Sequence, residues 1–102
     1  MSSVSGVDTL DHANEEAVYG TLTVGTTAVE VKVGASPLDR RKLVTIQPMD
    51  NAVYWGYDSS VTTSTGTRVF KDQYLPLQVG PDITVFLIAN AAGKDVRIGE
   101  LA

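Results

Sequence analysis

The sequence predicts an all-β protein: a small β-sandwich or jelly-roll-like barrel of about eight antiparallel strands with a flexible N-terminal arm. Its 102 residues include 14 valines and 11 threonines, whose β-branched side chains favour strands over helices. Short alternating segments recur with turns roughly every eight to twelve residues, and no segment has a convincing helical period. We divide the chain into an arm at residues 1–16 and one β-sandwich domain at residues 17–102.

The arm is polar, and its acidic residues include Asp8, Asp11 and Glu15. It shows no sustained alternation, although residues 8–13 could form one helical turn. Such a terminus either contacts nothing or becomes ordered against a neighbouring subunit, and the sequence leaves both interpretations open.

Two strands are predicted directly after the arm. Residues 18–24 place Val18, Leu22 and Val24 on one side and polar residues with Tyr19 on the other. Residues 27–33 alternate more clearly, with three valines inward and Glu30 and Lys32 outward. Because only the short turn at residues 25–26 separates them, we expect the two strands to form a β-hairpin.

A surface connection at residues 34–41 leads to the next pair of strands. It contains a glycine, a proline and a charge cluster, which are typical of an exposed loop. Strands are then predicted at residues 43–47 and 52–57, separated by the turn residues 48–51.

The second half of the chain begins with residues 58–67, which are rich in serine and threonine. Such hydroxyl side chains bond to their own backbone, so we expect an ordered loop. Strands follow at residues 68–70 and 74–79. Residues 83–89 are apolar almost throughout, which predicts a strand in the middle of the sandwich with both sides covered. Residues 95–101 are predicted to form a closing edge strand.

Charge and composition exclude several functions. The net charge of −4 gives no electrostatic basis for binding nucleic acid, and no apolar run approaches the length of a membrane span. His12 is the one histidine, which removes most acid–base schemes. A cation site at Asp8, Asp11, His12 and Glu15 would require a helical arm, and we favour a solvated acidic terminus. We therefore predict no enzymatic activity, no catalytic residue, no cofactor and no metal site.

The candidate contact residues lie in three places. Strand alternation places Tyr54 on one side of its strand and Trp55 with Tyr57 on the other, so a buried Trp55 leaves Tyr54 at the surface. Tyr57, at the end of the strand, is chosen as a further surface candidate. Arg40 and Arg41 lie either in a solvated loop or at a contact with an acidic patch on a partner. The hydroxyl-rich loop either serves turn chemistry or bonds to a neighbouring subunit. The residues chosen as a partner interface are Arg40, Arg41, Tyr54, Tyr57, Thr62, Thr63 and Thr65.

Four segments together suggest a family: residues 41–48, residues 53–66 with the run Val-Thr-Thr-Ser-Thr-Gly, residues 85–89, and residues 95–100 with Asp-Val-Arg-Ile. This pattern resembles small virion structural proteins of tailed bacteriophages. The likeness spans residues 40–100 and leaves out the arm and the first two strands.

The resemblance implies a non-enzymatic capsid decoration, or cement, protein on the outer capsid surface. Its partners would be the major capsid protein and further copies of itself, with a trimer favoured, and it would be made in the host cytoplasm. A head-fibre, head-completion or tail-associated subunit is the alternative within the virion. A carbohydrate-binding module that recognises host glycans through Tyr54, Trp55 and Tyr57 is the alternative from another class.

Overall fold

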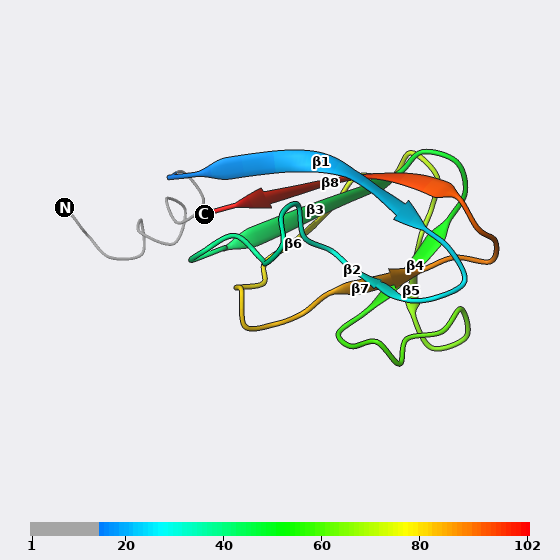
Figure 1. Ribbon diagram of the computed structural model, residues 1–102. Coiled ribbons are helices and arrows are strands. Elements are labelled where there is room, and N and C mark those ends of the chain that lie inside the picture. The colour runs from blue at the N-terminus through cyan, green and yellow to red at the C-terminus, as the bar shows by residue number, and fades with distance from the viewer. Residues whose placement is uncertain (1–14) are drawn as a thin grey trace.

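Two four-stranded antiparallel sheets face each other in the computed structural model, which describes residues 15–102 (Figure 1). The all-β prediction is confirmed: there are eight strands, and the described residues contain no helix. The helical turn expected at residues 8–13 lies outside the described residues. The first sheet has the order β1 (Ala17–Val24), β8 (Lys94–Leu101), β3 (Leu43–Pro48), β6 (Leu75–Leu77); the second has the order β2 (Val29–Glu30), β7 (Phe86–Ile88), β4 (Val53–Gly56), β5 (Thr67–Val69).

The register of the first sheet aligns the apolar sides of its strands. Gly20 of β1 lies beside Ile98 of β8, and Ile98 lies beside Ile46 of β3. The buried residues of β3 and β8 therefore share the face that points toward the second sheet. The alternation of apolar and polar residues in the sequence thus matches the alternation of buried and more exposed residues along β3.

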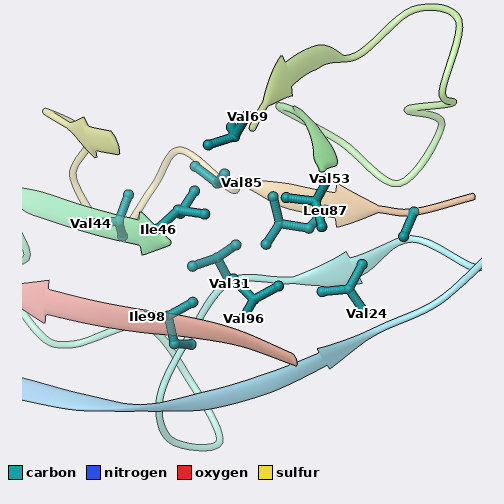
Figure 2. Close-up of a cluster of buried hydrophobic side chains, with 11 residues drawn as sticks. Val24, Val31, Val44, Ile46, Val53, Val69, Val85, Leu87, Val96 and Ile98 are labelled. Atoms are coloured by element: carbon teal, nitrogen blue, oxygen red, sulfur yellow. The ribbon is translucent and has the colours of Figure 1, made fainter. Parts of the chain in front are cut away.

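The core fills the space between the sheets with small branched side chains (Figure 2). Val53 of β4 and Leu87 of β7 enter it from the second sheet, and Ile46 and Val96 enter it from the first. Each such buried side chain contributes roughly 1.5–3 kcal/mol, so this core is the main source of stability in a chain without cysteine.

The predicted hairpin of the first two strands is wrong. β1 pairs with β8, whereas β2 pairs with β7 in the other sheet, so residues 25–28 carry the chain from one sheet to the other. A hairpin and a crossing between sheets both bury one side of each strand, and alternation cannot distinguish them. The second strand is also shorter than predicted, because beyond Val31 the chain turns to contact Glu100.

The predicted edge position of the last strand is also wrong. β8 lies between β1 and β3 and pairs along its length with both. Four of its residues, from Val96 to Glu100, are buried. The central position predicted for residues 83–89 is confirmed, since β7 lies between β2 and β4. Its two sides differ, however: Val85, Leu87 and Ala89 are buried, and Phe86 and Ile88 are half-buried.

Candidate binding surfaces

Arg41 is buried against Glu100 inside one end of the sandwich. Each residue is 1% exposed, and Arg41 Nη1 donates to Glu100 Oε2 at 2.8 Å. The guanidinium also donates to the backbone carbonyls of Val79, Gly80 and Ile83, at 3.3, 2.8 and 2.8 Å.

The carboxylate of Glu100 completes this network from the other side. Its two oxygens accept the backbone N–H groups of Val33 and Leu38 at 3.0 and 3.2 Å. The pair therefore fastens the loops at residues 31–42 and 78–83 to β8. Its polar atoms are occupied within the fold, and neither residue presents a surface to a partner. The expectation that Arg41 lies in a solvated loop or at a partner contact is wrong.

Arg40 is the exposed member of the arginine pair. Its side chain lies on the surface, and Nη2 is 3.6 Å from Glu15 Oε1. Its backbone adopts a φ of 57°, in the left-handed region, which turns the chain between the two arginines. Of the two arginines, only Arg40 is therefore accessible to a partner.

The aromatic cluster of β4 divides between the two sides of the second sheet. Tyr54 is half-buried on the outer side, while Trp55 is half-buried and packs against the core. Tyr57 is 57% exposed, and its ring meets that of Trp55 edge-on, at 5.1 Å and 84°. Trp55 therefore reaches the core only in part. The coplanar stacking surface that a sugar would need from Trp55 and Tyr57 is absent.

The hydroxyl-rich loop is ordered, as predicted, and its side chains hold its own backbone. Thr65 Oγ1 accepts the N–H of Thr62, and Thr62 Oγ1 accepts the N–H groups of Ser64 and Thr65 at 3.2 and 3.1 Å. Thr62, Thr63 and Thr65 are all exposed, and the side chains of two of them, Thr62 and Thr65, already serve turn chemistry.

The same loop is fixed at two further points. Asp58 Oδ1 accepts the hydroxyl and the N–H of Ser60, and these bonds lower the pKa of the exposed Asp58 carboxyl. Val61 is 7% exposed because it lies over Gly56 and Gly66. A β-carbon on either glycine would come within 2.8 Å of Val61 Cγ2, so both positions need a residue without a side chain.

A hollow of about 270 Å³ opens on the outer face of the first sheet. Two tyrosines border it: Tyr19 of β1 is 89% exposed, and Tyr74, just before β6, is 60% exposed. Between them, polar side chains come from three strands: Thr21, Thr45, Gln47 and Arg97. We call Tyr19, Thr21, Thr45, Gln47, Tyr74 and Arg97 the tyrosine face.

The sheet register explains how this face is assembled. Tyr19 lies beside Gly99, which lies beside Thr45, and Gly99 contributes no side chain between them. In the next row of the same side, Arg97 lies between Thr21 and Gln47. Asp95 holds the Arg97 guanidinium at 3.2 Å, and Gln47 Nε2 donates to the carbonyl of Asp72. These side chains offer apolar surface and hydrogen-bonding groups.

A second, more polar hollow lies beside the outer side of the second sheet. Tyr54, Phe70 and Lys94 are among its lining residues, and the Arg68 guanidinium lies 4.7 Å from the centre of the Phe70 ring. Tyr57 borders a third hollow together with Ile83. The candidate residues of the sequence are therefore spread over separate places and do not form one site.

Neither a metal centre nor a membrane-crossing helix is found within residues 15–102. No three or more acidic, histidine or cysteine side chains in that range are grouped to hold an ion, and no helix there could span a bilayer. Asp8, Asp11 and His12 of the conceivable cation site lie outside the described residues.

Sequence reasoning missed Glu100, Tyr19 and Tyr74. Glu100 is in phase with Val96 and Ile98, so strict alternation already placed a carboxylate at a core position. Tyr19 lies on the opposite side of its strand from Val18, Leu22 and Val24. A large aromatic side chain on a solvent-facing side could have indicated a contact surface. Nothing in the sequence indicated that Tyr19 and Tyr74 share one face, because that depends on the order of the strands in the sheet.

Comparisons with known proteins identify no relative: no family model, curated protein or solved structure matches this chain.

Proposed function

We propose that this chain is a non-enzymatic virion structural protein of a tailed bacteriophage, which decorates the capsid by binding the major capsid protein. The class rests on the resemblance of residues 40–100. The observation that carries the binding role is the tyrosine face, where Tyr19 and Tyr74 are exposed on either side of Arg97. Tyrosine and arginine are, with tryptophan, the residues enriched where protein interfaces gain most of their energy.

The interior of the molecule supports a contact role as well. The buried ion pair and the hydroxyl-rich loop serve to hold the domain in shape. A rigid domain loses little freedom on binding, and repetition over a lattice strengthens modest contacts. In this proposal the protein lies on the outer capsid surface with its first sheet toward the capsid.

Co-sedimentation with tailed-phage capsids that lack the protein tests this role. We expect saturation at hundreds of copies per particle. A few copies would favour a head-fibre, head-completion or tail-associated subunit, and no binding would contradict a place in the virion.

The contacting face is tested by Tyr74→Ser, with Tyr57→Ser as the matched control. The two side chains are similarly exposed, at 60% and 57%, but only Tyr74 belongs to the tyrosine face. Loss of an aromatic hot spot weakens binding by roughly tenfold or more, and we expect that loss for Tyr74→Ser alone. The reverse result would move the contact to the Tyr57 side of the domain.

A carbohydrate-binding role is the second candidate, and the same face favours it. Two exposed tyrosine rings border a hollow that also offers hydroxyl, amide and guanidinium groups, which is the chemistry that holds a sugar. Binding on a glycan array that is lost in Tyr74→Ser would support this role in place of capsid decoration.

A further inference from the structure

Within residues 15–102, no strand pairs with the outer edge of the eight-residue strand β1. Glu16 and Ala102 exchange two backbone hydrogen bonds, each of 2.8 Å, just before β1 begins. Because such pairs alternate in an antiparallel ladder, the even-numbered residues of β1 bond to β8. The N–H and C=O groups of Ala17, Tyr19, Thr21 and Thr23 therefore point away from the sheet, and none has a backbone partner within residues 15–102.

The other three edges of the sandwich are protected against pairing. β2 has two residues, one of them Glu30; β5 has three, with Arg68 in the middle; β6 has three, with Pro76 in the middle. Short length, charge and proline are the devices that keep sheet edges from joining other chains. β1 has none of them, since it is long, uncharged and free of proline.

We propose that the β1 edge binds the β1 edge of a second copy, antiparallel and about a two-fold axis at Gly20. In this register Tyr19 pairs with Thr21 of the partner copy and Ala17 with Thr23, so all four unpaired residues find backbone partners. A shift by one pair of residues in either direction leaves an end residue without a partner inside the strand. Gly20 lies on the axis and faces Gly20 of the second copy as a pair without hydrogen bonds, where strands approach to about 4.5 Å.

Charge favours a second copy as the occupant. The chain carries a net charge of −4, and β1 is an uncharged strip, so pairing along it brings no like charges directly opposite each other. Glu16, just before the strand, falls opposite Val24 of the other copy, so like charges do not face each other. A two-fold contact uses each β1 edge once and therefore stops at a dimer.

The pairing also places Tyr19, the most exposed large hydrophobic residue of the described chain, beside Thr21 of the second copy. The two Tyr19 side chains become diagonal neighbours on the outer side, within reach of each other at about 7–8 Å between their backbones. The two tyrosine faces then lie side by side on one continuous sheet. The proposed pairing does not depend on the virion role, because dimer formation can be tested on the purified chain without capsids.

Solution mass is the first test. Sedimentation equilibrium from micromolar to millimolar concentration should show association from 10.9 kDa to twice that mass. A chain that stays at 10.9 kDa, or that forms the trimer implied by the resemblance, overturns the proposal. Hydrogen exchange at the amides of Tyr19 and Thr21 should slow as the dimer forms; protection in the monomer would mean that the chain covers its own edge, which also overturns it.

Variants at the edge provide the second test. Thr21→Pro removes an N–H that β8 does not use, and Thr21→Lys keeps that N–H but adds a charge; both should remain folded by circular dichroism and sediment as monomers. The control Thr63→Lys places the same charge on the exposed loop and should still dimerise. A dimer that persists in both Thr21 variants contradicts the β1 contact.

Cross-linking tests the register. The chain has no cysteine, so a mixture of Tyr19→Cys and Thr21→Cys chains can form a disulfide between copies only at the new positions. We expect oxidation to trap the mixed dimer. A mixture of Tyr19→Cys with Thr63→Cys should stay unlinked, and equal trapping in both mixtures would contradict the proposed pairing.

Discussion

Arg40 and Arg41 are adjacent residues of the same type, yet they meet different environments. The left-handed backbone at Arg40 separates the directions of their side chains. Arg40 pairs with Glu15 at the surface, where solvent screens the interaction, and Arg41 is enclosed with Glu100. A buried arginine without its carboxylate, or the reverse, would leave a charge that water cannot reach.

Arg41→Met should lower the free energy of unfolding by about 3–5 kcal/mol, because it leaves the Glu100 carboxylate buried without its cation. Arg40→Met removes the same charge from the surface and should change that free energy by less than about 1 kcal/mol. Urea denaturation of the two variants measures the difference. Similar losses for both would show that Arg41 is not enclosed.

A double-mutant cycle determines how strongly Arg41 and Glu100 are coupled. Glu100→Gln alone leaves the guanidinium without its charged partner, whereas the double variant with Arg41→Met removes both charges. The double variant should therefore lose less stability than the two single losses added together. Strict additivity in the same urea experiment would contradict a direct buried pair.

Among the elements, the loop at residues 58–66 depends on close packing over the second sheet. Val61 reaches Gly56 and Gly66, and Gly66 also lies against Tyr54. The loop is therefore part of the covered outer side of β4, although its hydroxyl groups face solvent. The serine and threonine content of the loop predicted its internal hydrogen bonds. The packing of the loop on the second sheet depends on Gly56 and Gly66, whose lack of side chains leaves room for Val61.

Gly66→Ala should destabilise the domain by about 1–3 kcal/mol, since the new methyl group overpacks the site. It would come within 2.8 Å of both Tyr54 Cβ and Val61 Cγ2. The control Gly34→Ala has its nearest neighbour at 3.9 Å, and we expect it to be neutral or to stabilise by up to about 1 kcal/mol. Thermal unfolding distinguishes them, and a neutral Gly66→Ala would contradict the packing of Val61 over the glycines.

At the scale of the whole molecule, the two ends of the described chain are joined. The N–H groups of Glu15 and Glu16 both donate to the carbonyl of Ala102, and from there β1 and β8 run together (Figure 1). The sandwich is thus closed by residues that are far apart in sequence. Such pairing makes folding slower than in a fold of local contacts.

Deletion of residues 1–14 should leave the urea midpoint unchanged, because both sheets and the bonds to Ala102 lie within residues 15–102. If the arm contacts a neighbouring subunit, the shortened chain should co-sediment with capsids more weakly than the full chain. Failure to fold would contradict the independence of the domain, and undiminished binding would contradict an arm contact.

The sequence by itself determined the all-β class, the eight strands to within a few residues, and the inward side of most of them. These are local properties: the alternation of Val29 and Val31 or of Val96 and Ile98 depends only on neighbouring positions. Turn residues likewise marked the ends of strands, and the hydroxyl-rich loop was ordered as predicted.

Only the tertiary structure decided which strands pair and which side chains become neighbours. Alternation is the same whether β1 joins β2 or β8, because pairing across many residues depends on the packing of the whole core. For that reason the hairpin, the edge position of the last strand and the exposure of Arg41 were predicted wrongly. The same physical cause placed Tyr19 and Tyr74 on one face of the first sheet and, within residues 15–102, left the outer edge of β1 unpaired.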